Sequence, residues 1–170
     1  MNSRLSLLCY LVIIISFFGF KQASSQSNNW THFRGSNLNG ISETVNIPLK
    51  WDDSTIKWKT EIHDKGYSSP VVYGNQIWVT TASPEGNDLY AVCLDYITGK
   101  IIYDIKVFSP DDIEGKHPTN SYASPTPCIE KGYVYVHYGN MGTACINTAN
   151  GVIFWKRTDF KCKHVQGPAS

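Results

Sequence analysis

The chain has little charge and no marked excess of either sign. Its 170 residues include 15 Lys and Arg against 14 Asp and Glu, and charged residues make up 17% of the sequence. A protein that binds nucleic acid by neutralising phosphates needs a clear excess of basic residues, so this class is excluded. Disorder driven by a high net charge is excluded as well.

Two further patterns are missing from the sequence. No two cysteines have the Cys-x-x-Cys spacing of a zinc knuckle or a redox dithiol. After the first 25 residues, no apolar stripe of useful length follows the 3.6-residue period of a helix. Aromatic residues, in contrast, make up 13% of the chain, together with 13 Gly and 8 Pro. This composition favours a β-rich, turn-rich fold over a helical bundle.

The N-terminus has the pattern of an export signal. Arg4 precedes an apolar run over residues 5–20, and the small residues Ala23 and Ser25 stand at the −3 and −1 positions of a cleavage site. We therefore expect a cleaved signal peptide over residues 1–25 and a periplasmic or secreted protein with no membrane span in its mature chain. The alternative is a single membrane anchor, which needs about 20 apolar residues.

A repeat follows the signal. Residues 93–103 and 145–155 share a cysteine, an Asp or Asn, a glycine and an aromatic residue at the same places. Ser69-Pro70 and Ser124-Pro125 begin similar upstream segments in which β-rich runs follow. These matches define two units, at about residues 66–108 and 122–160, and the start of a third at the C-terminus.

Each unit is predicted to contain four short strands. In the first unit the strands fall at residues 71–73, 76–81, 89–94 and 101–107. Turn residues separate them, and the second unit repeats the turns, including Asn150-Gly151. Four strands in each of two repeats are typical of β-propeller blades, because a single blade cannot bury both of its faces. We predict an all-β chain with about two four-stranded antiparallel blades of an incomplete ring.

Four cysteines remain after the signal, at positions 93, 128, 145 and 162. In an exported protein they can form two disulfides in three pairings. Alternatively, they are small apolar strand residues with free thiols. The second interpretation is favoured, because Cys93 and Cys145 stand at equivalent positions of the two units.

The repeated segment resembles the tryptophan-docking motif of quinoprotein propellers, Ala-x-Asp-x-x-Thr-Gly-Lys-x-x-Trp. The first copy has four identical positions and replaces the first and last residues of the motif, by Cys93 and Tyr103. The identical positions are Asp95, Thr98, Gly99 and Lys100. The second copy keeps Gly151 and Trp155, with the conservative replacements Asn147 and Asn150. Trp58, in Ile56-Lys57-Trp58-Lys59, resembles the end of such a unit, that is, the outer strand of a blade whose other strands lie elsewhere.

The resemblance implies a pyrroloquinoline-quinone-like β-propeller, similar to the quinoprotein alcohol dehydrogenases and to the outer-membrane assembly propeller. It covers most of residues 30–168, with residues 26–55 as an N-terminal segment and residues 56–170 as the repeats. In such proteins the aromatic residue of the motif projects between blades. The group holds both dehydrogenases and non-catalytic binding scaffolds, so the resemblance implies the fold more strongly than an activity.

The best candidates for a functional loop lie between the two units. His117, Asn120 and Ser121 belong to the part that resembles one secreted branch of the family, although they can instead shape the loop that leads into the second blade. The acidic stretch at residues 111–117 can bind calcium or a partner, or it is a solvated loop. His32, His63, His137 and His164 are isolated, without the spacing of catalytic or metal-binding pairs.

We therefore predict an exported, non-enzymatic β-propeller scaffold that binds a protein or a small ligand at the end of the ring and needs no cofactor. The alternative is a quinoprotein-like dehydrogenase using pyrroloquinoline quinone and calcium. Active members of the family commonly place two adjacent cysteines against the quinone, and this sequence has no such pair. No residue of this sequence is assigned to catalysis or to cofactor binding.

Overall fold

The computed structural model of the protein describes residues 29–45, 47–161 and 166–168. The predicted signal peptide and Cys162 lie outside the described residues. Within these ranges the chain forms eight strands and two short 3₁₀ helices, η1 (Asp53–Thr55) and η2 (Gly139–Met141). No helix in the described ranges is long and apolar enough to cross a membrane.

The strands form two antiparallel sheets, each with its strands in sequence order. Sheet A consists of β1 (Val71–Tyr73), β2 (Gln76–Ala82), β3 (Leu89–Asp95) and β4 (Ile101–Phe108). Sheet B consists of β5 (Cys128–Glu130), β6 (Tyr133–His137), β7 (Thr143–Asn147) and β8 (Ile153–Arg157). The predicted all-β class and the two four-stranded units are confirmed, and three strands of sheet A end one residue later than predicted.

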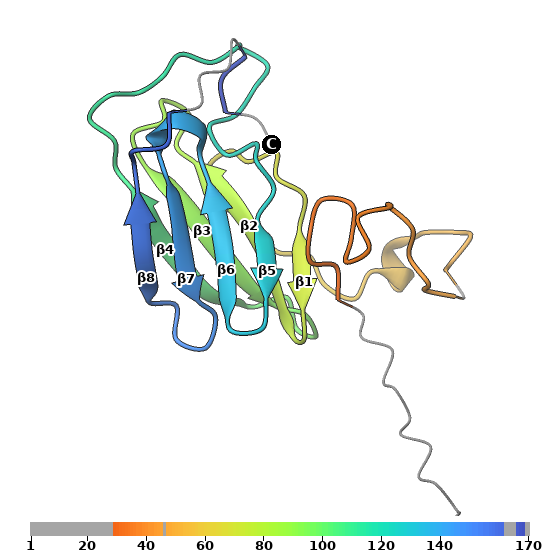
Figure 1. The fold of residues 1–170 in the computed structure, drawn as a ribbon. Coiled ribbons are helices and arrows are strands. Elements are labelled where there is room, and N and C mark those ends of the chain that lie inside the picture. The colour runs from red at the N-terminus through yellow and green to blue at the C-terminus, as the bar shows by residue number, and fades with distance from the viewer. Residues whose placement is uncertain (1–28, 46, 162–165, 169–170) are drawn as a thin grey trace, which may run out of the picture.

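The two sheets are stacked face to face, with sheet B in front of sheet A in Figure 1. The inner face of each sheet is built from alternate, fully buried strand residues, as expected for strands with one face in a core. Sheet A contributes Val71, Trp78, Leu89, Ala91 and Cys93, and sheet B contributes Ile129, Val134, Val136, Ala144 and Ile146. Tyr138 crosses from sheet B to sheet A, where its hydroxyl donates a 2.7 Å hydrogen bond to the carbonyl of Tyr90.

The N-terminal segment is attached to sheet A at two places. Trp30 and Val72 exchange two backbone hydrogen bonds of 2.8 Å, which extends the sheet beyond β1. Lys65 and Ala82 exchange two of 3.1 Å at the end of β2. Between these attachments the chain passes through η1 and then runs across the face of sheet A that sheet B does not cover. Both faces of sheet A are therefore contacted by other parts of the chain.

Candidate functional site

The indole ring of Trp58 packs on the turn between β3 and β4. A Cβ atom placed on Gly99 would lie 2.5 Å from the indole, so only a glycine allows this contact. Gly99 also has a φ of +70°, a conformation that glycine adopts without steric cost. The indole Nε1 donates a 3.2 Å hydrogen bond to the carbonyl of Tyr96 in the same turn.

Tyr103 makes the same contact one unit later. Its ring packs on Gly151, where an added Cβ would lie 2.9 Å from the ring. The Tyr103 hydroxyl donates a 2.8 Å hydrogen bond to the carbonyl of Ala149, within the turn between β7 and β8. Tyr103 is on β4 and the turn is in sheet B, so this contact joins the two sheets. In both contacts, an aromatic side chain packs on the glycine turn of the sheet that follows it in the sequence.

The polar residues of the motif hold these turns in shape. The Asp95 carboxylate accepts hydrogen bonds from the backbone of Ile97 at 3.0 Å and of Thr98 at 2.7 Å, and from the Thr98 hydroxyl at 2.8 Å. The hydrogen bonds from Thr98, together with those from Ile97 and Asn75, lower the pKa of Asp95. Lys100 completes the turn, because its carbonyl accepts a 2.8 Å hydrogen bond from the Asp95 amide. In the second copy of the motif, the Asn147 side-chain oxygen accepts a 2.9 Å hydrogen bond from the Ala149 amide.

The outer face of sheet B has no described part of the chain stacked on it, and we call it the open face. A row of side chains crosses it from strand to strand, in the register Cys128, Tyr135, Cys145 and Trp155. The register of sheet A gives the equivalent row, Val71, Trp78, Cys93 and Tyr103, which sheet B covers. The open face therefore repeats, position by position, a face that is buried in the neighbouring unit.

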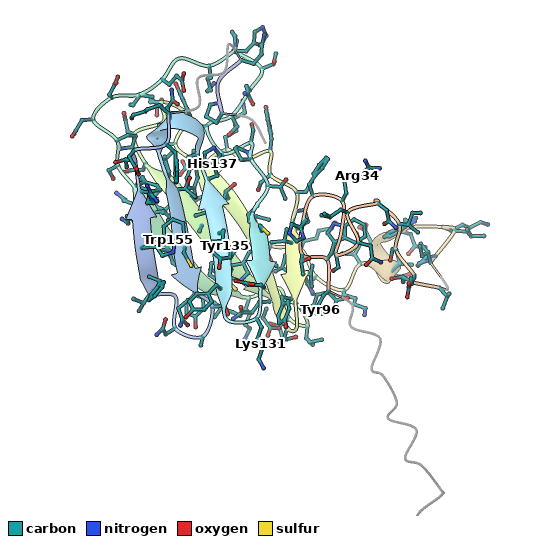
Figure 2. The ribbon with its side chains drawn as sticks, viewed as in Figure 1. Arg34, Tyr96, Lys131, Tyr135, His137 and Trp155 are labelled. Carbon is teal, nitrogen blue, oxygen red and sulfur yellow. The ribbon has the colours of Figure 1, made fainter. Side chains whose placement is uncertain are left out.

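Aromatic rings dominate the open face. Tyr135 and Trp155 have ring centroids 6.2 Å apart, and Tyr133 and Phe154 have theirs 5.6 Å apart. Figure 2 shows Tyr135, His137 and Trp155 together on the strands of this sheet. Phe154 remains 67% exposed. Trp155, at the position that Tyr103 occupies in sheet A, lies half-buried on this face and not between the two sheets.

Three ionisable side chains of the open face have raised pKa values, which keeps them protonated at neutral pH. The Tyr135 hydroxyl donates a 2.6 Å hydrogen bond to Glu130, which together with burial raises the pKa of Tyr135 to about 12. Burial also raises the pKa of the thiols of Cys128 and Cys145. A protonated thiol is a poor nucleophile, so the row is suited to packing and not to covalent chemistry. Cys93, Cys128 and Cys145 are free, as favoured from the sequence.

The predicted loop residues fasten the connection between the sheets. The Asn120 side chain donates hydrogen bonds to the carbonyls of Gln166 at 2.7 Å and Pro168 at 3.3 Å. The Ser121 hydroxyl donates one of 2.8 Å to the carbonyl of Lys65 and accepts one of 3.1 Å from the amide of Ala123. These contacts join segments that are far apart in sequence.

His117 lies at the start of the same loop, with an exposed side chain. Its Nδ1 is 2.8 Å from the hydroxyl of Thr119. The acidic stretch before it does not converge on a cation site: no group of three His, Cys, Asp or Glu side chains within the described ranges is arranged to hold a metal ion.

One cluster was missed from the sequence. His63, interpreted as isolated, lies between two carboxylates, with Nδ1 2.7 Å from Asp64 and Nε2 3.1 Å from Asp104. Its ring also meets the ring of Tyr90 edge-on at 4.7 Å. Burial lowers the pKa of His63, but the hydrogen bonds and charges of Asp104 and Asp64 outweigh it, and the pKa is raised overall. Asp104 is 41 residues away, so only the adjacent Asp64 signalled this cluster.

Comparison of the chain with models of known protein families and with curated proteins finds no match.

Proposed function

We propose that the protein is an exported, non-enzymatic scaffold that binds another protein through stacked β-sheets. The proposed architecture is part of a β-propeller of the pyrroloquinoline-quinone-like repeat kind. Two features support it: the two sheets have the same strand order, and each receives an aromatic side chain on the glycine turn between its last two strands. Repeats of this kind bury their faces by stacking on their neighbours.

The open face of sheet B is the proposed binding surface, and its equivalence to a buried face carries the proposal. Trp78 in sheet A is fully buried because sheet B covers it. Tyr135 holds the same register position in sheet B and remains partly exposed. Exposed aromatic residues on a face built for packing mark a protein interaction site. The surface fits the face of another β-sheet.

Photo-crosslinking tests this assignment. A photoreactive phenylalanine analogue replaces Phe154 on the open face, or Ile97 on the turn of sheet A as a matched control. Both side chains are 67% exposed. In the compartment where the protein naturally occurs, we expect a crosslink to a protein from position 154 and none from position 97. Equal crosslinking from both positions, or none from either, would contradict the proposal.

The dehydrogenase alternative is tested by an activity assay of the full chain. The full chain is supplied with pyrroloquinoline quinone and calcium, and dye-linked oxidation of alcohols is measured. A scaffold gives the rate of the buffer containing quinone and calcium alone. A rate that depends on the protein, together with retention of quinone by the protein, would replace the scaffold proposal with the enzymatic one.

A further inference from the structure

The crossing segment, residues 56–65, is fastened to sheet A by contacts around His63. The carbonyl of His63 accepts a 2.7 Å hydrogen bond from the Thr81 hydroxyl of β2. The imidazole ring reaches β4, where Nε2 lies 3.1 Å from a carboxylate oxygen of Asp104. His63 therefore connects the crossing segment to two strands of sheet A, through its backbone and through its side chain.

Both ring nitrogens of His63 face carboxylate oxygens. Nδ1 lies 2.7 Å from Asp64, and Nε2 lies 3.1 Å from Asp104. A neutral imidazole has one N–H donor and one lone pair, and an ionised carboxylate only accepts hydrogen bonds. In the neutral ring, one nitrogen would therefore direct its lone pair at a carboxylate oxygen. Only the imidazolium, which donates from both nitrogens, satisfies the two contacts together.

The other charged groups near this cluster leave its two carboxylates to His63. Within the described ranges, the titratable side chains that contact the His63 ring come from its own segment, from β3 and from β4, and they are Asp64, Tyr90 and Asp104. Lys106 of β4 lies over the ring of Tyr90 and pairs with Asp88 at 3.0 Å. The ammonium of Lys106 is thus paired with a carboxylate other than Asp104.

The backbone beside His63 is strained. Asp64 has a φ of +59°, in the left-handed region that residues other than glycine adopt only at a cost. Such a conformation persists where the surrounding contacts fix it. Here His63 fixes it on one side, and on the other side Lys65 exchanges two backbone hydrogen bonds of 3.1 Å with Ala82. A weaker contact at His63 would let this turn relax, at the expense of the pairing between Lys65 and Ala82.

We propose that His63 is a proton-dependent attachment, which fastens the crossing segment to sheet A as the imidazolium and loosens it when one ring nitrogen gives its proton to solvent. No other covalent bond changes in this step. Burial lowers the pKa of His63, but the hydrogen bonds and charges of Asp104 and Asp64 raise it overall. The attachment is therefore complete below pH 6.5 and weakens as the pH rises through the raised pKa. It is independent of the binding role proposed for the open face of sheet B.

Site-resolved amide hydrogen exchange of the full chain tests the proposal. The reporters are the amides of Lys65 and Ala82, which bond each other's carbonyls beside His63. The reference amides are those of Trp30 and Val72, which bond in the same way where the N-terminal segment meets β1. Protection factors, corrected for the intrinsic exchange rate at each pH, are compared below pH 6.5 and well above it.

We expect the protection of the Lys65 and Ala82 amides to fall about threefold to fivefold as the pH rises, the scale of partly exposed ion pairs, and that of the reference amides to stay constant. His63→Gln should remove this pH dependence, whereas His117→Gln, at an exposed histidine, should preserve it. Constant protection of the reporters, an equal loss at the reference amides, or a pH dependence that survives His63→Gln would overturn the proposal.

NMR of the imidazole nitrogens gives a second readout that needs no variant. Both ring nitrogens of His63 should be mainly protonated at pH 6.5, and one of them should lose its proton over the interval in which the reporter amides lose protection. A His63 ring that is mainly neutral at pH 6.5, or one that loses its proton without a change at the reporters, would overturn the proposal.

Discussion

The contact between Tyr103 and Gly151 can be tested with a substitution that differs from its control in one respect. Gly151→Ala introduces two costs. The φ of +71° is strained for any residue with a Cβ atom, which costs about 1–2 kcal/mol. The new Cβ would also lie 2.9 Å from the Tyr103 ring, and such overpacking costs about 1–3 kcal/mol more.

Gly74→Ala is the matched control. Gly74 has a φ of +58°, and nothing lies within 4 Å of the position of its added Cβ. This substitution should therefore lower the free energy of unfolding by the backbone cost alone, about 1–2 kcal/mol. In a Tyr103→Ala background the overpacking disappears, and Gly151→Ala should then cost about as much as Gly74→Ala.

Urea denaturation followed by circular dichroism gives the midpoints of all variants. We expect the midpoint of Gly151→Ala to fall well below that of Gly74→Ala, with equal m-values. If the two midpoints coincide, or if Tyr103→Ala does not reduce the effect of Gly151→Ala, the two sheets are not joined through this ring.

Three further predictions concern other contacts of the fold. First, the pKa of His63 is raised in the folded protein, so protonated His63 stabilises the fold. This contribution is complete below the ordinary pKa of 6.5 and is lost as the pH rises through the raised pKa. The difference in unfolding midpoint between the parent and His63→Gln should therefore shrink across that interval, and a constant difference would refute this. Second, Cys128 should react with a thiol reagent before Cys93, since Cys93 is fully buried and burial raises the pKa of its thiol to about 12. Mass spectrometry gives the order of modification, and simultaneous modification of the two thiols would contradict this. Third, Asn120→Ala should lower the free energy of unfolding by about 1 kcal/mol and the melting temperature by about 2–4 °C, whereas His117→Ala should change neither. Equal melting temperatures of the two variants would show that Asn120 does not fasten the loop.

The strands were predictable because their signals are local. Alternation in Gln76–Ala82 and the glycine turns at Gly74 and Gly99 depend on neighbouring residues, and the structure has them where the sequence indicated. The pairing within each unit follows from short turns, which leave antiparallel neighbours as the simple solution. The free thiols followed from the repeat, because Cys93 and Cys145 hold equivalent strand positions.

Contacts between distant segments were not predictable in the same way. The pairing of His63 with Asp104 depends on how residues 56–65 cross sheet A, which no local pattern specifies. Asn120 was selected from a resemblance, and its bonds to residues 166 and 168 depend on the folded path of the C-terminal part of the chain. The open face could be recognised only from the register of the two sheets, since the sequence alone does not tell which face of a strand is covered.

Hydroxyl-radical footprinting of Trp155 tests the proposed role of the open face most directly. The oxidation rate of Trp155 is compared between the purified chain and the protein in its natural compartment, with Trp78, which is fully buried, as the internal reference. If another protein covers the open face, Trp155 should be oxidised readily in the purified chain and as slowly as Trp78 in the natural setting. Equal oxidation of Trp155 in the two settings, well above that of Trp78, would contradict a docking role for this face.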